Sequence, residues 1–137
     1  WMPALTDADR PEALAPALFE RIARVYGPYG RPLLDAVAAD PTLGEPLVEG
    51  LPVIKAEVLH ATAHEYAATL DDLFARRTML TTENLPWQGH TRALTEAVGE
   101  LLHWSPAECE EQHALWLRAI AQHDPFTAQK IASLDTP

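Results

Sequence analysis

The chain has 137 residues, enough for one domain whose core needs no disulfide or metal. Its formal net charge is −10, and so acidic a surface disfavours binding to nucleic acid or to anionic lipid. Cys109 is the only cysteine, which excludes a disulfide framework and a cysteine-based zinc site and fits a cytoplasmic protein. No apolar run approaches the roughly 18–20 residues that span a bilayer, and no signal peptide pattern is present.

The first ten residues show no hydrophobic periodicity, so we expect residues 1–10 to be a linker remnant. Because the chain begins with Trp1 rather than methionine, we expect a fragment of a longer protein. An amphipathic helix is then predicted over residues 11–26, with Pro11 in its first turn and Gly27 and Pro28 at its end. Its apolar side chains recur at helical spacing: Leu14, Leu18, Ile22 and Val25.

A shorter helix is predicted over residues 31–39, with Pro32 near its start and a break at Pro41. Residues 42–52 are rich in proline and glycine, which forbids a long helix there. We therefore expect a connector, with a short extended segment near residues 47–53.

The segment from 53 to 78 contains two predicted helices. The first covers residues 53–67. The second covers residues 69–77, with Thr69 as its N-cap, acidic residues in its first turn and arginines in its last. Asp72 and Arg76 are spaced to form an i,i+4 ion pair on this second helix.

Two further helices are predicted in the last third of the chain. After a loop over residues 81–89, residues 90–104 carry an apolar stripe. Ser105 and Glu108 form a capping-box pattern with Pro106 at the first helical position, so a helix should run from there to about His123. That helix should bury Leu115, Trp116 and Ile120. Residues 125–137 are expected to be a tail with a helical turn at 127–134.

The predicted fold is therefore all-α, a single compact domain of about five or six helices over residues 11–124. The pattern also allows the one short extended segment near residues 47–53.

His60 and His64 are spaced to share one face of a helix, and Glu57 precedes His60 by three positions. Helical histidine pairs bind zinc, and Glu-x-x-His is half of a di-iron carboxylate set. The second Glu-x-x-His is missing, and Ala61 stands where a zinc protease carries glutamate. We therefore assign no metal ligand and interpret both histidines as surface or interface residues.

Cys109 and His113 have the same four-residue spacing, but a cysteine nucleophile normally takes its base from another element. We interpret them as a packed cysteine beside a solvated histidine. Arg76 and Arg77 resemble an anion site, yet they lie at a helix C-terminus, which repels anions. Capping and a salt bridge between helices or domains are the favoured interpretation, so no catalytic residue is assigned.

Cofactor motifs are absent from the sequence. No G-x-G-x-x-G turn, no phosphate-binding loop and no G-x-S-x-G elbow occurs. We therefore assign no cofactor-binding residue and expect no cofactor in this chain.

The stretch from Glu57 to Thr78 reads EVLHATAHEYAATLDDLFARRT. It resembles a motif in the C-terminal helical domain of FAD-dependent glycerol-3-phosphate dehydrogenases, E-V-x-Y-A-x-R-H-E-x-A-x-T-L-x-D-x-L-x-R-R-T. The preceding EPLVEGLPVIKAEV and the later LLHWSPAECEEQ are also similar to that family. The likeness covers roughly residues 19–122. His60 stands where the family usually has tyrosine, Ala63 where it has arginine and Phe74 where it has leucine or valine.

The resemblance implies a parent enzyme that oxidises sn-glycerol 3-phosphate to dihydroxyacetone phosphate and passes electrons through FAD to a quinone. In that family the flavin and substrate residues lie in the preceding domain. We therefore expect residues 11–124 to be an accessory domain, inactive alone, whose partner is the FAD/substrate domain of the same polypeptide. A homo-oligomer, and membrane contact through a parent peripheral on the inner membrane face, are also compatible. The alternatives are a stand-alone helical protein-interaction module and a metalloprotein built on His60 and His64.

Overall fold

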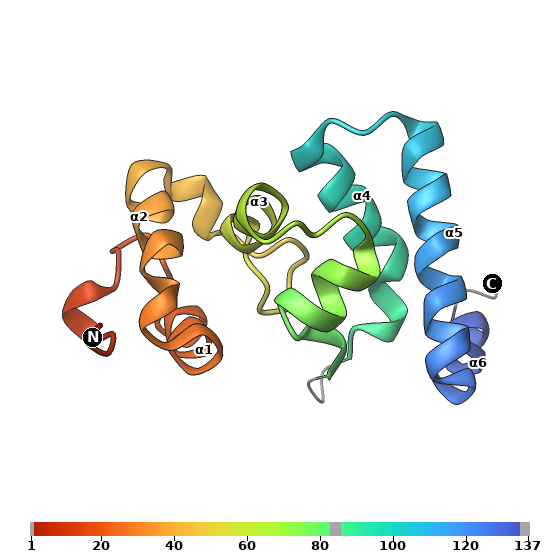
Figure 1. Ribbon diagram of the computed structural model, residues 1–137, viewed down its shortest axis with the longest axis horizontal. Coiled ribbons are helices and arrows are strands. Elements are labelled where there is room, and N and C mark those ends of the chain that lie inside the picture. The colour runs from red at the N-terminus through yellow and green to blue at the C-terminus, as the bar shows by residue number, and fades with distance from the viewer. Residues whose placement is uncertain (1, 83–85, 135–137) are drawn as a thin grey trace.

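The computed structural model describes residues 2–82 and 86–134. Within this part the protein is all-α, as predicted, with six α-helices and no β-strand. In Figure 1, α1 and α2 lie at one end, α3 in the middle, and α4, α5 and α6 at the other end. The helices are α1 (Pro16–Tyr26), α2 (Arg31–Ala39), α3 (Lys55–His64), α4 (Thr91–Leu102), α5 (Pro106–His123) and α6 (Pro125–Leu134).

Helix α1 begins later than predicted, at Pro16 instead of Pro11. A proline inside a helix lacks the N–H that the ladder needs and collides with the preceding turn, so Pro16 is accommodated only at the first position. Residues 11–14 form a turn instead, in which the Leu14 N–H donates to the Pro11 carbonyl at 3.0 Å. Gly27 ends α1 with a positive φ of 56°, as its position in the sequence predicted.

Residues 2–10, expected to be a linker remnant, are folded against α1 and α2. Leu5 packs against the apolar cluster of these helices. Asp9 accepts a hydrogen bond from Arg31 at 3.0 Å, and the pKa of Asp9 is lowered by hydrogen bonds from Thr6 and Arg31.

The prediction of an extended segment near residues 47–53 is wrong. One isolated antiparallel bridge joins Pro46 to Ile54, and the Leu47 N–H donates to the Val53 carbonyl at 2.9 Å. Pro46 and Pro52 have no N–H to donate, so a ladder does not extend from this bridge. The apolar side chains of the segment are nevertheless buried: Leu47, Leu51 and Val53.

The segment after α3 is helical as predicted, but its geometry is unusual. Thr69 caps it, because its hydroxyl oxygen accepts a hydrogen bond from the Asp72 N–H at 3.1 Å. Residues Asp72–Arg77 then form a π-helix, which ends with the Thr78 N–H bonded to the Leu73 carbonyl at 2.9 Å. Single π-turns are rare, and they occur frequently at functional sites.

Helices α4 and α5 are joined at Ser105, where the predicted capping box is present. Helix α5 runs to His123 as expected and buries Trp116 and Ile120, but Leu115 is 37% exposed, so its predicted burial is wrong. Leu115 adjoins the buried face without belonging to it. Residues 83–85 of the predicted loop lie outside the described residues.

The segment expected to be a tail starts with helix α6. Asp124 caps this helix by accepting a hydrogen bond from the Thr127 N–H at 3.2 Å, and this hydrogen bonding lowers the pKa of Asp124. Ile131 is only 2% exposed, because α6 packs against the same core as α5. Residues 135–137 lie outside the described part.

Two apolar clusters form the interior. The larger lies under α3 to α6 and the π-helix, and the smaller lies between α1 and α2. Helix α3 contributes to both, with Val58 in the larger cluster and Ala56 in the smaller. This helix therefore joins the two ends of the molecule seen in Figure 1.

Helices α4 and α5 approach closely at Gly99. A Cβ atom at this position would lie 2.4 Å from the Sγ atom of Cys109. We predict that Gly99→Ala destabilises the fold by about 1–3 kcal/mol through overpacking, despite the higher helix propensity of alanine. Gly89→Ala is the matched control, since a Cβ there meets only Leu134 at 3.8 Å. Chemical denaturation of both variants measures the difference. The double variant Gly99→Ala/Cys109→Ala should regain stability, and a failure to regain it would contradict the overpacking.

Candidate functional site

His60 and His64 share a helix face, with ring centroids 5.0 Å apart. Glu65 is their acidic neighbour, with its Oε1 atom 3.7 Å from His60 Nε2. Glu57 does not join them, because its carboxylate is bound in the interior by Arg21, Tyr26 and the Ile54 N–H. Across residues 2–82 and 86–134, no three histidine, cysteine, aspartate or glutamate side chains are grouped to hold a metal.

We predict that the protein carries no stoichiometric zinc or iron, because His60 and His64 lack a third ligand among the described side chains. Elemental analysis of protein purified without a histidine tag measures this. One equivalent of metal that is lost in His64→Ala, and retained in the control His123→Ala, would contradict this interpretation.

In the other two predicted pairs, Cys109 with His113 and Arg76 with Arg77, each member contacts a different residue. His113 is buried, not solvated as predicted, and its Nε2 atom lies 3.2 Å from Thr91 Oγ1. Cys109 packs against Gly99 of α4. Arg76 forms the predicted ion pair with Asp72 at 3.6 Å, and Arg77 Nε lies 4.0 Å from Glu65 Oε2.

The most unusual arrangement of charge is a buried network that sequence reasoning did not predict. Arg21 of α1 and Glu57 of α3 are 4% and 1% exposed, and Arg21 Nη1 donates to Glu57 Oε1 at 2.7 Å. The Tyr26 hydroxyl donates to the same carboxylate oxygen at 2.8 Å, and the Ile54 N–H donates to Glu57 Oε2 at 2.7 Å. Arg21 also donates to the carbonyl of Thr78, next to the π-helix.

Burial governs the ionisation of this network. Desolvation raises the pKa of the Glu57 carboxyl, while Arg21 and the hydrogen bonds act in the opposite direction. Burial and the neighbouring Glu57 charge raise the pKa of the Tyr26 hydroxyl, which therefore stays protonated as a donor. The sequence held one signal of the network: Arg21 follows Leu18 by three and precedes Val25 by four, on the apolar stripe of α1.

Removal of one member of the buried pair should leave an unpaired charge in the interior. We predict that Arg21→Met or Glu57→Leu alone destabilises the protein by about 3–5 kcal/mol. The double variant Arg21→Met/Glu57→Leu should lose much less than the sum of the two. Urea denaturation measures the coupling, and additive losses would contradict a direct pair. In the exposed control pair, Arg92→Met with Glu110→Leu, the coupling should be below about 1 kcal/mol.

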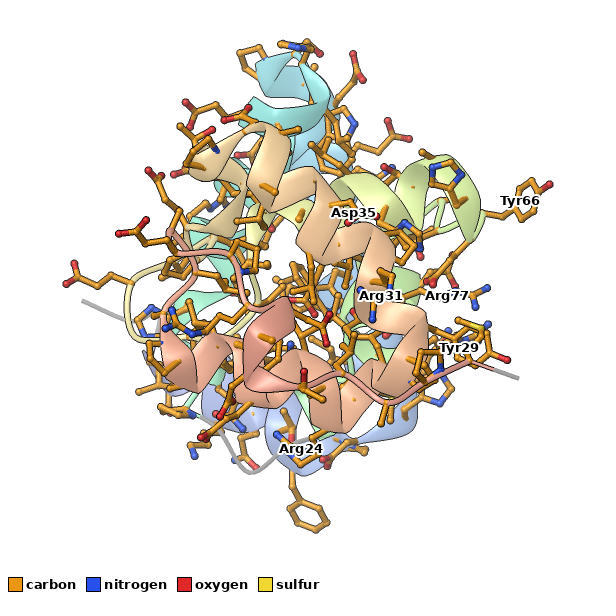
Figure 2. The ribbon with its side chains drawn as sticks, turned by 90° about the vertical axis from the view of Figure 1, so that its left-hand side faces the viewer. Arg24, Tyr29, Arg31, Asp35, Tyr66 and Arg77 are labelled. Carbon is orange, nitrogen blue, oxygen red and sulfur yellow. The ribbon has the colours of Figure 1, made fainter. Side chains whose placement is uncertain are left out.

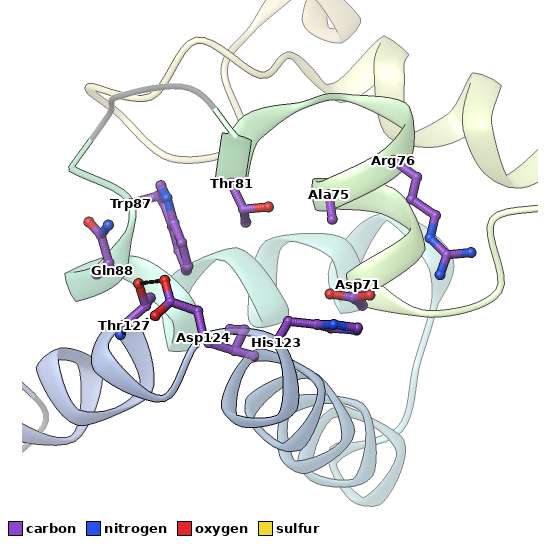
Figure 3. A pocket seen from close by; sticks show the side chains of 10 residues that line it. Asp71, Ala75, Arg76, Thr81, Trp87, Gln88, His123, Asp124 and Thr127 are labelled. Carbon is purple, nitrogen blue, oxygen red and sulfur yellow. Dashed lines mark hydrogen bonds between the residues drawn. The ribbon is translucent and has the colours of Figure 1, made fainter.

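A cavity of about 350 Å³ lies between the π-helix, the loop at Trp87 and the junction of α5 and α6 (Figure 3). Trp87 forms one wall and stacks on Trp116 with ring centroids 6.0 Å apart. The ionisable side chains of the cavity are Asp71, Arg76, His123 and Asp124. Asp124 is engaged by Thr127 in capping α6.

The buried groups and the cavity do not coincide. In active sites, ionisable groups with shifted pKa values gather around a pocket. Glu57 and Tyr26 have raised pKa values, but neither residue lines this cavity. The residues also do not fit FAD, because the described part has no strand leading into a glycine-rich turn. No helix in the described ranges is long and apolar enough to cross a membrane.

These features define a class of protein: an all-α domain organised around a buried ion pair. Comparison with known proteins identifies the family. Residues 5–109 match the C-terminal domain of alpha-glycerophosphate oxidase, and the chain belongs to this family. The family resemblance seen in the sequence is thus confirmed.

Individual relatives agree with this assignment. Glycerol-3-phosphate dehydrogenase 2 of Mycobacterium tuberculosis is 29% identical over 111 residues, which are 80% of this chain and 19% of the relative. A glycerol-3-phosphate dehydrogenase of Synechocystis is 32% identical over 64% of this chain and 16% of its own length. A probable mitochondrial glycerol-3-phosphate dehydrogenase of Dictyostelium discoideum is 32% identical over 68% of this chain and 15% of its own. The chain thus spans less than a fifth of these relatives, and no solved structure matches it.

Proposed function

We propose that this chain is the accessory C-terminal domain of an FAD-dependent glycerol-3-phosphate dehydrogenase. In this proposal the parent enzyme oxidises sn-glycerol 3-phosphate to dihydroxyacetone phosphate. The FAD and the substrate bind to a preceding domain of the same polypeptide, and the helical domain supports that domain or its assembly. The observation that carries the proposal is the family match over residues 5–109 together with the small share, 19%, of a relative that the chain covers.

The internal organisation of the domain supports a role in packing. Its buried charges are neutralised within the domain, so that Arg21 and Glu57 are not available to a substrate. The cavity beside Trp87 contains the Asp71 and Asp124 carboxylates as well as Arg76 and His123, so it offers no net positive charge to a phosphate-bearing substrate. For both reasons we assign no step of the oxidation to residues of this chain.

The test compares three proteins: the full reading frame that contains this chain, the same protein lacking residues 11–134, and the chain alone. We expect the full protein to contain FAD and to reduce an artificial electron acceptor when sn-glycerol 3-phosphate is added. The chain alone should bind no FAD and show no activity, because its residues do not form a flavin site. The shortened protein should retain FAD but unfold at a lower temperature than the full protein.

Absorbance at flavin wavelengths, acceptor reduction and thermal unfolding provide the three measurements. Stoichiometric FAD or glycerol 3-phosphate oxidation by the chain alone would overturn the division of roles. Equal thermal stability of the full and shortened proteins would contradict the supporting role.

A further inference from the structure

Two tyrosines and two arginines form a distinct surface, which we call the aromatic–arginine face: Tyr29, Arg31, Tyr66 and Arg77. Figure 2 shows these four side chains toward the right of its view: Tyr29 and Arg31 lie near the start of α2, and Tyr66 projects outward beyond the end of α3. Tyr29 is 71% exposed and Tyr66 is 91% exposed. Large aromatic side chains so exposed, with arginines around them, have the composition of a protein interface core.

Contacts near the surface hold the parts of this face together. The Tyr26 hydroxyl lies 3.5 Å from the carbonyl oxygen of Arg77. Tyr29 follows Tyr26 in the 3-10 turn Gly27–Gly30, and Arg31 is the first residue of α2. On the other side, Arg77 Nε lies 4.0 Å from the Oε2 atom of Glu65, which directly precedes Tyr66. The face therefore spans segments far apart in the sequence, and the buried network of Arg21 and Glu57 lies beneath it.

The backbone at Tyr66 is strained. Its φ of 58° is in the left-handed region, which non-glycine residues rarely adopt. The neighbouring N–H groups hold this conformation, since those of Glu65 and Ala67 both donate to the Ala61 carbonyl, at 3.1 and 3.2 Å. The ring gains almost no burial in return, because it is 91% exposed. This left-handed residue follows the C-terminus of α3, where such a conformation commonly ends a helix, and it turns the Tyr66 ring out from the surface.

We propose that the aromatic–arginine face docks this domain on the preceding part of the same polypeptide. This inference rests on the proposed function. The family is by description a C-terminal domain, and this chain covers 19% of a matched relative, so most of that relative precedes the matched stretch. The first described residues, 2–10, lie beside α1 and α2 in Figure 1, and Figure 2 views that side.

Charge supports the same surface. The chain has a net charge of −10, but on this side the acidic groups are balanced locally. Asp9 pairs with Arg31, and Glu65 lies beside Arg77. An incoming surface meets less electrostatic repulsion here than on the acidic remainder. The preceding domain would present carboxylates to Arg31 and Arg77 and an apolar recess to Tyr66.

The experiment uses the full reading frame that contains this chain, with a photo-crosslinking residue at one position. Tyr66→p-benzoylphenylalanine places the probe on the proposed face, and Phe126→p-benzoylphenylalanine is the matched control. Phe126 is 85% exposed on α6 and lies outside the family match. After irradiation, mass spectrometry identifies the crosslinked peptides. We expect crosslinks from position 66 to residues of the same polypeptide that precede this chain, and none of that kind from position 126.

A charge reversal sharpens the test. Arg77→Glu, combined with the probe at position 66, should abolish these crosslinks, whereas Arg118→Glu, on the exposed side of α5, should leave them unchanged. Crosslinks to the preceding part from position 126 but not from 66 would overturn the docking face while leaving the proposed function intact. Crosslinks from position 66 only to a second copy would also overturn it. A reading frame with no flavin-binding part would instead contradict the proposed function.

Discussion

Arg21 and Glu57 are almost entirely removed from water, and their ion pair connects α1 with α3 at the boundary between the two apolar clusters. Removing two opposite charges from water costs several kcal/mol per ion. Their mutual attraction offsets this cost only when further hydrogen bonds satisfy both groups. Here the Tyr26 hydroxyl and the Ile54 N–H donate the further hydrogen bonds that the Glu57 carboxylate accepts. A rotation of α1 by one residue would place Arg21 in apolar surroundings, so we infer that the pair specifies the register of the helices.

This network also determines where surface groups are placed. Arg21 donates to the carbonyl of Thr78, directly after the π-helix. A π-turn contains one residue more than an α-turn would, and it changes the direction in which the following side chains project. The position of Arg77 beside Glu65 therefore depends on an interaction in the interior. A substitution in the core is expected to disturb the surface at this point, even though the surface residues themselves remain unchanged.

The buried Arg21–Glu57 pair lies apart from the cavity beside Trp87. An enzyme exposes its perturbed ionisable groups to a pocket, whereas here Glu57 is satisfied by protein groups alone. The cavity beside Trp87 has charged groups at its wall, and one of them, Asp124, is used to start α6. Such an organisation suits a domain that presents a rigid surface to a larger protein, in agreement with the small share of each relative that it covers.

Features encoded within a few neighbouring residues were predictable from the sequence: α2, the capping box at Ser105, the Thr69 cap, and the family motif from Glu57 to Thr78. These depend on local hydrogen bonds and steric rules that operate over one helical turn. The tertiary structure alone decided the burial of Arg21 and His113, the exposure of Leu115 and the π-geometry before Thr78. Arg21 and Glu57 are 36 residues apart, and only the packing of α1 against α3 removes both from water and makes their pairing necessary.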